Sequence, residues 1–150
     1  MKYFWSTIRH KWFVIKASFR VGLPLWCALV HDLSKFGQSE LPHYNRQFFG
    51  DKGDPRGFAT AWLHHQNYNP HHWEYWMTRS DHSHGKSGAV DKCLPMPEIY
   101  VREMIADWLG ASMTYTGSWD ITSWSTKNMP NMYLHPDTRQ RIMQLLEEVC

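Results

Sequence analysis

Apolar residues recur along the chain at helical spacing, and polar or glycine-containing stretches separate the periodic segments. Over residues 3–20 this spacing is kept by five large side chains, Phe4, Ile8, Trp12, Ile15 and Phe19. Such a repeat every three or four positions indicates one apolar face of an α-helix. No segment alternates convincingly between apolar and polar residues as a half-buried strand does. The pattern therefore predicts an all-α protein.

Glycine, proline and capping residues divide the chain into six to seven expected helices. These span residues 3–20, 23–34, 39–49, 57–67, 70–79, 97–115 and 136 to the C-terminus. The second is apolar nearly all round, so we expect it to be buried. Residues 80–95, which should be mobile, and 116–135 are polar and are expected to be irregular connections. With no internal repeat, residues 1–150 are expected to form one compact helical domain.

Composition narrows the classes of function. A formal net charge of only +2 gives no strong signal for nucleic-acid binding, which usually needs a basic face. No apolar run approaches the roughly 18 residues of a membrane helix. The three cysteines, Cys27, Cys93 and Cys150, form no CxxC pair, which indicates reduced thiols. We therefore expect a cytoplasmic protein, in a bacterium or a phage-infected host cell, without a membrane partner and with self-association possible.

Histidine is the unusual residue type. The chain has ten histidines, and six of them fall within residues 64–84: His64, His65, His71, His72, His82 and His84. The last two lie in a polar stretch and are expected to be loop residues. The other four come after the predicted helix 23–34 and before the helix 97–115. Their density raises the expectation of a metal site.

The strongest local motif is His31-Asp32, at the end of the predicted second helix. Adjacent His and Asp side chains can offer an imidazole nitrogen and a carboxylate oxygen to one metal ion. Lys35 follows about one turn later, where its ammonium could neutralise charge on a phosphate. The alternative is an ordinary helix C-terminus, where a histidine is electrostatically favourable.

HDLSK, residues 31–35, resembles the HDIGK-type signature of HD-domain phosphohydrolases. That family is helical and binds metal through a first His, the His-Asp pair and a later Asp. The resemblance implies His10, His31, Asp32 and Asp107 as ligands, and an HD-like helical bundle as the fold. The stretches HDLSKF, AWLHHQNYNPHHWEYW and EMIADW are also similar to a group of small phage and bacterial proteins of this superfamily. No substrate is established for that group.

Within HD proteins, a two-metal branch adds a middle His and a later His-His pair. The resemblance implies His64, preferred to His65 by analogy, together with His71 and His72. It also implies one or two divalent transition-metal ions (Mn, Fe, Co, Zn or Mg), and the added histidines favour two. The alternative for His71 and His72 is stacking against nearby tryptophans. The GYP signature of the cyclic-dinucleotide phosphodiesterases is absent.

The resemblance implies a metal-dependent phosphohydrolase that cleaves a phosphate ester of a small metabolite through a metal-bound hydroxide. That the substrate is a nucleotide is implied only by the substrates of the HD family, and by no residue of this sequence. Besides Asp32 and Lys35, Glu40 and Glu103 are candidate catalytic groups, as proton carriers or as supports for the ligands. The alternatives are an HD-type diiron oxygenase and a non-catalytic nucleotide-binding protein. Most tryptophans should pack in the core, with one ring available to stack on a base.

Overall fold

Apart from an isolated β-bridge between Met77 and Cys93, the regular elements of the computed structural model are helices, over the described residues 2–78 and 92–149. The α-helices are α1 (Lys2–Val21), α2 (Leu25–Val30), α3 (Leu41–Phe49), α4 (Pro55–Tyr68), α5 (Glu98–Tyr115), α6 (Thr122–Asn128) and α7 (Pro136–Val149). Short 3-10 helices are η1 (Leu33–Phe36), η2 (Trp73–Trp76) and η4 (Met129–Asn131). The all-α prediction is confirmed. The expected loop histidines His82 and His84 lie outside the described residues.

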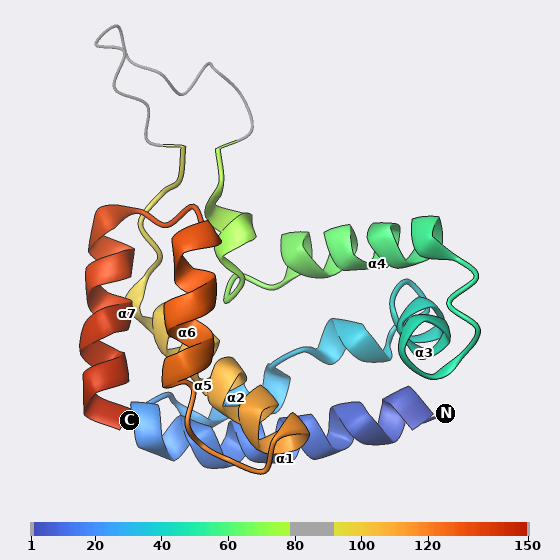
Figure 1. Cartoon of the computed structure of the whole chain (residues 1–150), viewed down its shortest axis with the longest axis horizontal. Helices are drawn as coiled ribbons and strands as arrows, with labels where there is room; N and C mark the ends of the chain where they lie inside the picture. The colour runs from blue at the N-terminus through green and yellow to red at the C-terminus, as the bar shows by residue number, and fades with distance from the viewer. Residues whose placement is uncertain (1, 79–91, 150) are drawn as a thin grey trace, which may run out of the picture.

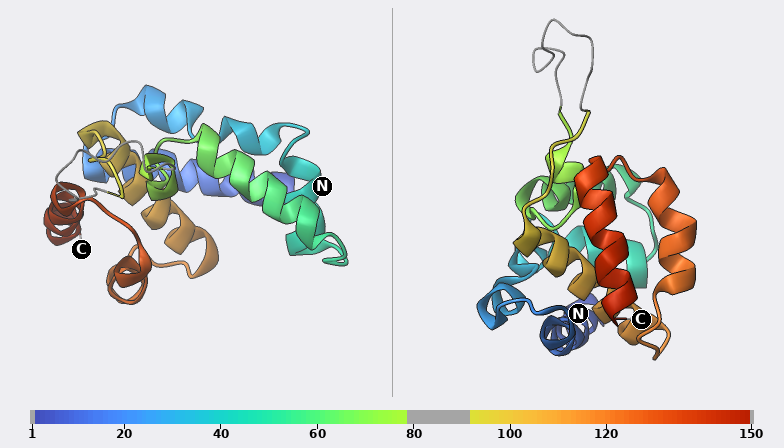
Figure 2. Two further views of the ribbon diagram at one scale, coloured as in Figure 1. Left: turned by 90° about the horizontal axis from the view of Figure 1, so that it is seen from above. Right: turned by 90° about the vertical axis from the view of Figure 1, so that its left-hand side faces the viewer.

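The central pair of the fold is α1 and α5, which pack along one another more extensively than any other two elements. Helices α6 and α7 lie at one end of the molecule and α3 and α4 at the other (Figures 1 and 2). The close approach of the central pair depends on Gly110 of α5. A Cβ atom there would lie 2.7 Å from Cγ2 of Val14 on α1, inside van der Waals contact. Glycine therefore lets the two backbones meet.

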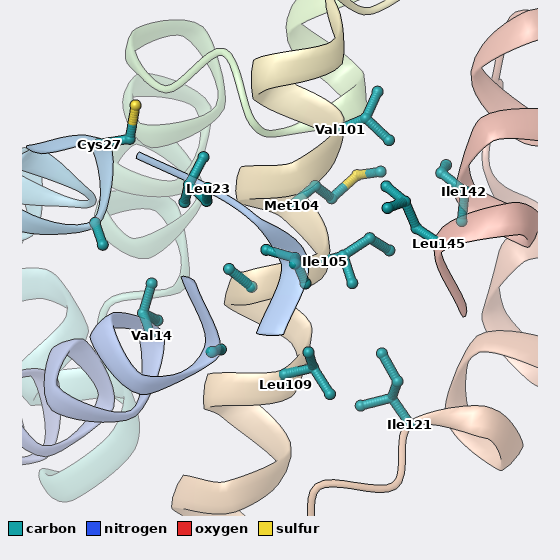
Figure 3. Packing of buried hydrophobic residues seen from close by; sticks show 14 of the residues in the cluster. Val14, Leu23, Cys27, Val101, Met104, Ile105, Leu109, Ile121, Ile142 and Leu145 are labelled. Atoms are coloured by element: carbon teal, nitrogen blue, oxygen red, sulfur yellow. The ribbon is translucent and has the colours of Figure 1, made fainter. Parts of the chain in front are cut away.

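Two apolar clusters hold the helices together. The larger joins α1, α5 and α7 and includes Val14, Ile105, Leu109, Ile142 and Leu145 (Figure 3). The smaller joins α1, α3 and α4 through Tyr3, Tyr44 and Ala61. On α1, His10 lies between Tyr3 of one cluster and Val14 of the other. The polar site described below is thus placed between two apolar supports.

The prediction of a buried helix over 23–34 is wrong. Helix α2 has six residues, and only Cys27 and Ala28 are buried in it. Its other side chains are 45–62% exposed, namely Leu25, Trp26, Leu29 and Val30. The helix begins after Pro24 and ends at His31, whose ψ of 129° is not helical. A helix this short presents only one face to α1, so the remaining apolar side chains of α2 face outward.

Two further boundaries differ from the predictions. The helix expected over 70–79 is absent from its described part, residues 70–78: only the single 3-10 turn η2 is present there, because His72 takes an extended conformation (φ −83°, ψ 132°). Residues 116–135 are not wholly irregular, since they contain α6 and η4. Just before α6, Asp120 Oδ1 accepts a hydrogen bond from the Thr122 amide at 2.8 Å, which shapes the turn that leads into the helix.

In the described part of the chain, no helix combines the length and the apolar character needed to cross a bilayer.

Candidate metal centre

Four side chains from three parts of the chain form a first ligand group. His10 comes from α1, Asp107 from α5, and His31 and Asp32 from the segment after α2, with ligand atoms all within 4.8 Å of one another. His10 Nε2 lies 2.9 Å from Asp107 Oδ1. His31 Nε2 lies 3.3 Å from Asp32 Oδ2 and 3.4 Å from Asp107 Oδ1. The structure thus brings together the four positions expected from the HD resemblance.

The backbone explains how adjacent His31 and Asp32 face the same point. Successive side chains of a regular helix point about 100° apart. Here the helix stops at His31, and Asp32 takes a left-handed conformation with φ 56° and ψ 26°. Aspartate is one of the few non-glycine residues that tolerate this region. The turn directs both side chains into the interior, where they are at most 1% exposed.

A second ligand group shares Asp32 with the first. It consists of Asp32, His65 from the end of α4, and His71 and His72 from the segment before η2. Asp32 Oδ1 lies 3.3 Å from His65 Nε2 and 3.4 Å from His71 Nε2. Since Oδ2 faces His31 of the first group, the two oxygens of one carboxylate face two different ligand groups.

These side chains fit divalent metal ions. At metal–ligand distances of about 2.1 Å, neighbouring ligand atoms are separated by about 3.0 Å in octahedral and about 3.4 Å in tetrahedral geometry. The five ligand-atom pairs described above, separated by 2.9–3.4 Å, match that range. The buried Nε2 atoms of all five histidines and the Oδ1 atom of Asp32 have no hydrogen-bond partner among the described residues. Buried polar atoms of this kind need a partner, and a cation would supply it.

Two buried glutamates orient the histidines from behind. Glu103 Oε1 accepts from His31 Nδ1 at 3.0 Å and lies 3.3 Å from His71 Nδ1. Glu40 Oε2 accepts from His65 Nδ1 at 2.9 Å. With Nδ1 protonated, each imidazole presents the lone pair of Nε2 to the ligand group, as metal-binding histidines do. Glu40 and Glu103, expected as proton carriers or supports, therefore occupy supporting positions.

Burial and charge set the protonation of the first group. Burial alone would lower the pKa of His31, but the carboxylates of Asp32, Asp107 and Glu103 raise it well above its ordinary value. Burial would raise the pKa of Asp32, yet His31 and Lys35 hold it well below its usual range. Burial likewise opposes ionisation of Asp107, but His10 and His31 lower its pKa. In the metal-free protein, the carboxylates and imidazoles of the first group therefore stabilise one another's charged forms.

In the second group, the surroundings favour the neutral form of the histidines. Burial and the neighbouring His31 lower the pKa of His71. Burial, His71 and His65 lower the pKa of His72 still further. Both imidazoles are thus neutral at physiological pH, which is the form that binds metal.

Lys35 lies against the cluster. Its Nζ is 2.5 Å from Asp32 Oδ2, and its side chain is 16% exposed. Burial would lower the pKa of Lys35, but the Asp32 carboxylate raises it above its ordinary value, so the ammonium stays charged. The lysine therefore places a fixed positive charge beside the Asp32 carboxylate.

The structure corrects the choice of His64 over His65. The His64 side chain is 40% exposed, and its Nδ1 pairs with Glu40 Oε1 at 2.7 Å, whereas His65 is fully buried in the second group. Helical spacing could have made the distinction. His65 lies four residues after the buried Ala61, and His64 lies four residues after the exposed Thr60.

The helical fold and the two ligand groups define an all-α protein with a buried cluster of histidines and carboxylates suited to metal ions. A family model matches residues 1–148, and the chain therefore belongs to DUF5662, a family of unknown function. Comparisons with curated proteins and with solved structures found no match.

Proposed function

We propose that this protein is a metal-dependent phosphohydrolase of the HD type, with two divalent ions held side by side. The observation that carries the proposal is the position of Asp32, whose two oxygens face two different ligand groups. A carboxylate shared in this way is suited to bridge two ions. Paired ions about 3.5–4 Å apart are typical of enzymes that cleave phosphate esters.

The proposed chemistry needs few groups from the protein. Bound ions would supply Lewis-acid activation of water and would neutralise charge on the phosphoryl group. Glu40 and Glu103 keep the imidazoles in the orientation and tautomer that bind metal. Lys35 adds positive charge next to Asp32, where a phosphoryl oxygen would approach. The proposed substrate is a small phosphorylated metabolite, and a nucleotide is the first kind to test.

The test begins with metal analysis. The protein is stripped with a chelator, reloaded with Mn, Co, Fe, Zn or Mg, and assayed for phosphate release from a panel of phosphate esters. We expect two ions per chain and hydrolysis with at least one metal. Full metal binding without phosphate release from any ester would contradict the proposal. Iron-specific oxygen consumption would instead support the diiron oxygenase alternative.

Replacement of Asp32, the residue proposed to bridge the two ions, is the most direct mutational test. Asp32→Asn keeps the size of the side chain but removes the charge that both groups share. Since loss of an outer supporting group alone costs 10–100-fold, we expect loss of at least one ion per chain and a fall in activity of about 100-fold or more. Asp51→Asn is the matched control, because the Asp51 side chain is 67% exposed and pairs with Arg46. That control should retain both metals and full activity.

A further inference from the structure

A cavity of about 290 Å³ opens directly on the ligand cluster. Its lining includes Asp107 of the first group and His71 and His72 of the second. A molecule in this cavity would therefore reach both groups at once. The cavity has room for the part of a substrate that extends beyond the reacting phosphoryl group.

Four indole rings form much of the remaining wall, from Trp62, Trp73, Trp108 and Trp124. Two of them follow ligands directly in the sequence: Trp73 follows His72, and Trp108 follows Asp107. Their rings are held by neighbours rather than left free. Trp108 and Trp124 pack edge to face with centroids 4.9 Å apart, and Trp62 meets the His72 ring in the same way at 5.5 Å. The wall thus offers fixed aromatic surfaces beside the cluster.

The small side chain of Ala111 leaves the cavity open. It lies four residues after Asp107 on α5, so the two side chains share one face of the helix. A small residue at this position leaves space next to the ligand, and Ala111 lines the cavity. A larger side chain there would extend into that space.

The charge of the wall restricts the ligand further. Among the described residues that line the cavity there is no lysine or arginine, and the acidic side chain besides Asp107 is Glu74. The faces of indole rings carry partial negative charge. A second phosphate would meet these faces and Glu74 without a cation to receive it. A planar ring would instead stack favourably on the indoles.

We propose that this cavity binds the leaving group of the substrate, and that this leaving group carries a planar aromatic ring and no second phosphate. The inference rests on the proposed phosphohydrolase function. In the reaction, water oxygen bonds to phosphorus, the ester P–O bond breaks, and the leaving oxygen takes a proton. The products are inorganic phosphate and a ring-bearing alcohol, as from a nucleoside monophosphate.

The first experiment compares substrates of the metal-loaded protein. AMP and the three other common nucleoside monophosphates carry the ring, ribose 5-phosphate lacks it, and ADP adds a second phosphate. We expect kcat/KM for the best monophosphate to exceed that for ribose 5-phosphate and for ADP by about 10- to 100-fold. Equal values for the best nucleoside monophosphate and ribose 5-phosphate would overturn the proposal. So would a preference for phosphocholine, since aromatic walls also attract cations.

The second experiment fills the cavity. Ala111→Leu should raise KM for the preferred monophosphate about 10-fold or more while leaving metal content unchanged. Ala59→Leu, on the exposed face of α4, is the matched control and should behave as the unaltered protein. Trp124→Leu removes a wall ring that is 44% exposed, with Trp12→Leu, 56% exposed on α1, as its control. These milder variants keep the test valid if Ala111→Leu folds poorly.

Binding separates this inference from the proposed function. AMP is titrated calorimetrically into the metal-loaded protein, and adenosine is titrated as the ring without phosphate. If no ester is hydrolysed, the phosphohydrolase proposal fails, but ring binding is still measured. AMP affinity that is unchanged in both Ala111→Leu and Trp124→Leu would overturn the cavity assignment. A loss in these variants and not in their controls would support it.

Discussion

His64 and His65 are neighbours in the sequence with opposite surroundings. The His64 ring stacks on Tyr68 near the surface, while the His65 ring is fully buried and directs Nε2 toward Asp32. Glu40 contacts both, since its two oxygens lie 2.7 Å from His64 Nδ1 and 2.9 Å from His65 Nδ1. One glutamate therefore connects a ligand candidate with a surface histidine.

This pair provides a matched test of the second ligand group. His65→Gln removes an inward-facing donor, so we expect the protein to retain one metal ion per chain instead of two and to lose most activity. His64→Gln should retain both ions, because the ligand atoms of the group are intact. Elemental analysis of the two variants after identical loading makes the comparison. The reverse result would restore His64 as the ligand.

At the scale of residues, the sequence could indicate the first ligand group because the HD signature specifies its order along the chain. Glu40 and Glu103 were expected as proton carriers or supports, but the sequence could not show which histidine each of them contacts. That arrangement depends on α3 and α5 meeting the cluster from different sides, which no local pattern encodes. The αL conformation of Asp32 was likewise not predicted, because non-glycine residues rarely adopt it.

At the scale of elements, the crossing of α1 and α5 fixes the distance between His10 and Asp107. The long amphipathic helices were predictable because each buries one regular face. The conformation of the segment around η2 was not predictable. His71 and His72 both turn toward the cluster, whereas a regular helix would point these two side chains in different directions. Helix α6 was missed because TSWSTKN consists mostly of weak helix formers, and no side chain caps its first turn.

The crossing gives a stability prediction at Gly110. Gly110→Ala would gain about 1 kcal/mol in helix propensity, but its Cβ would lie 2.7 Å from Val14 Cγ2. Overpacking of this kind costs about 1–3 kcal/mol, so we expect a net loss in the free energy of unfolding. Urea denaturation measures it. The same substitution should cost less in a Val14→Ala background, and equal costs in both backgrounds would show that this contact is not responsible.

At the scale of the molecule, the buried charges predict how the metal-free protein responds to acid. The pKa values of Asp32 and Asp107 lie well below their ordinary value, and hydrogen bonds from His31 and His71 overcome burial to lower that of Glu103 to about 2. Near pH 4 the unfolded chain therefore binds protons that the folded chain does not. Their stabilisation is present above the ordinary carboxyl pKa and is lost as pH falls through the folded values.

We expect the free energy of unfolding to fall between pH 6 and pH 3, by about 1.4 kcal/mol per group for each unit of pKa shift that is released. Chemical denaturation of the chelator-treated protein at several pH values measures this. Asp107→Asn should show a shallower dependence, because one of the groups no longer titrates. A slope equal to that of the unaltered protein would mean that Asp107 is not held ionised by the cluster.

The ligands that surround Asp32 come from positions 10 to 107 of the chain. An ion bound to them ties together segments that are otherwise distant along the backbone, much as a covalent cross-link does, and it has no equivalent site in the unfolded chain. Each ion bound in the proposed way would thus contribute its binding free energy to the folded state. The resistance of the protein to cellular proteases would then depend on metal binding. Its abundance in the cell would therefore rise and fall with the availability of the metal.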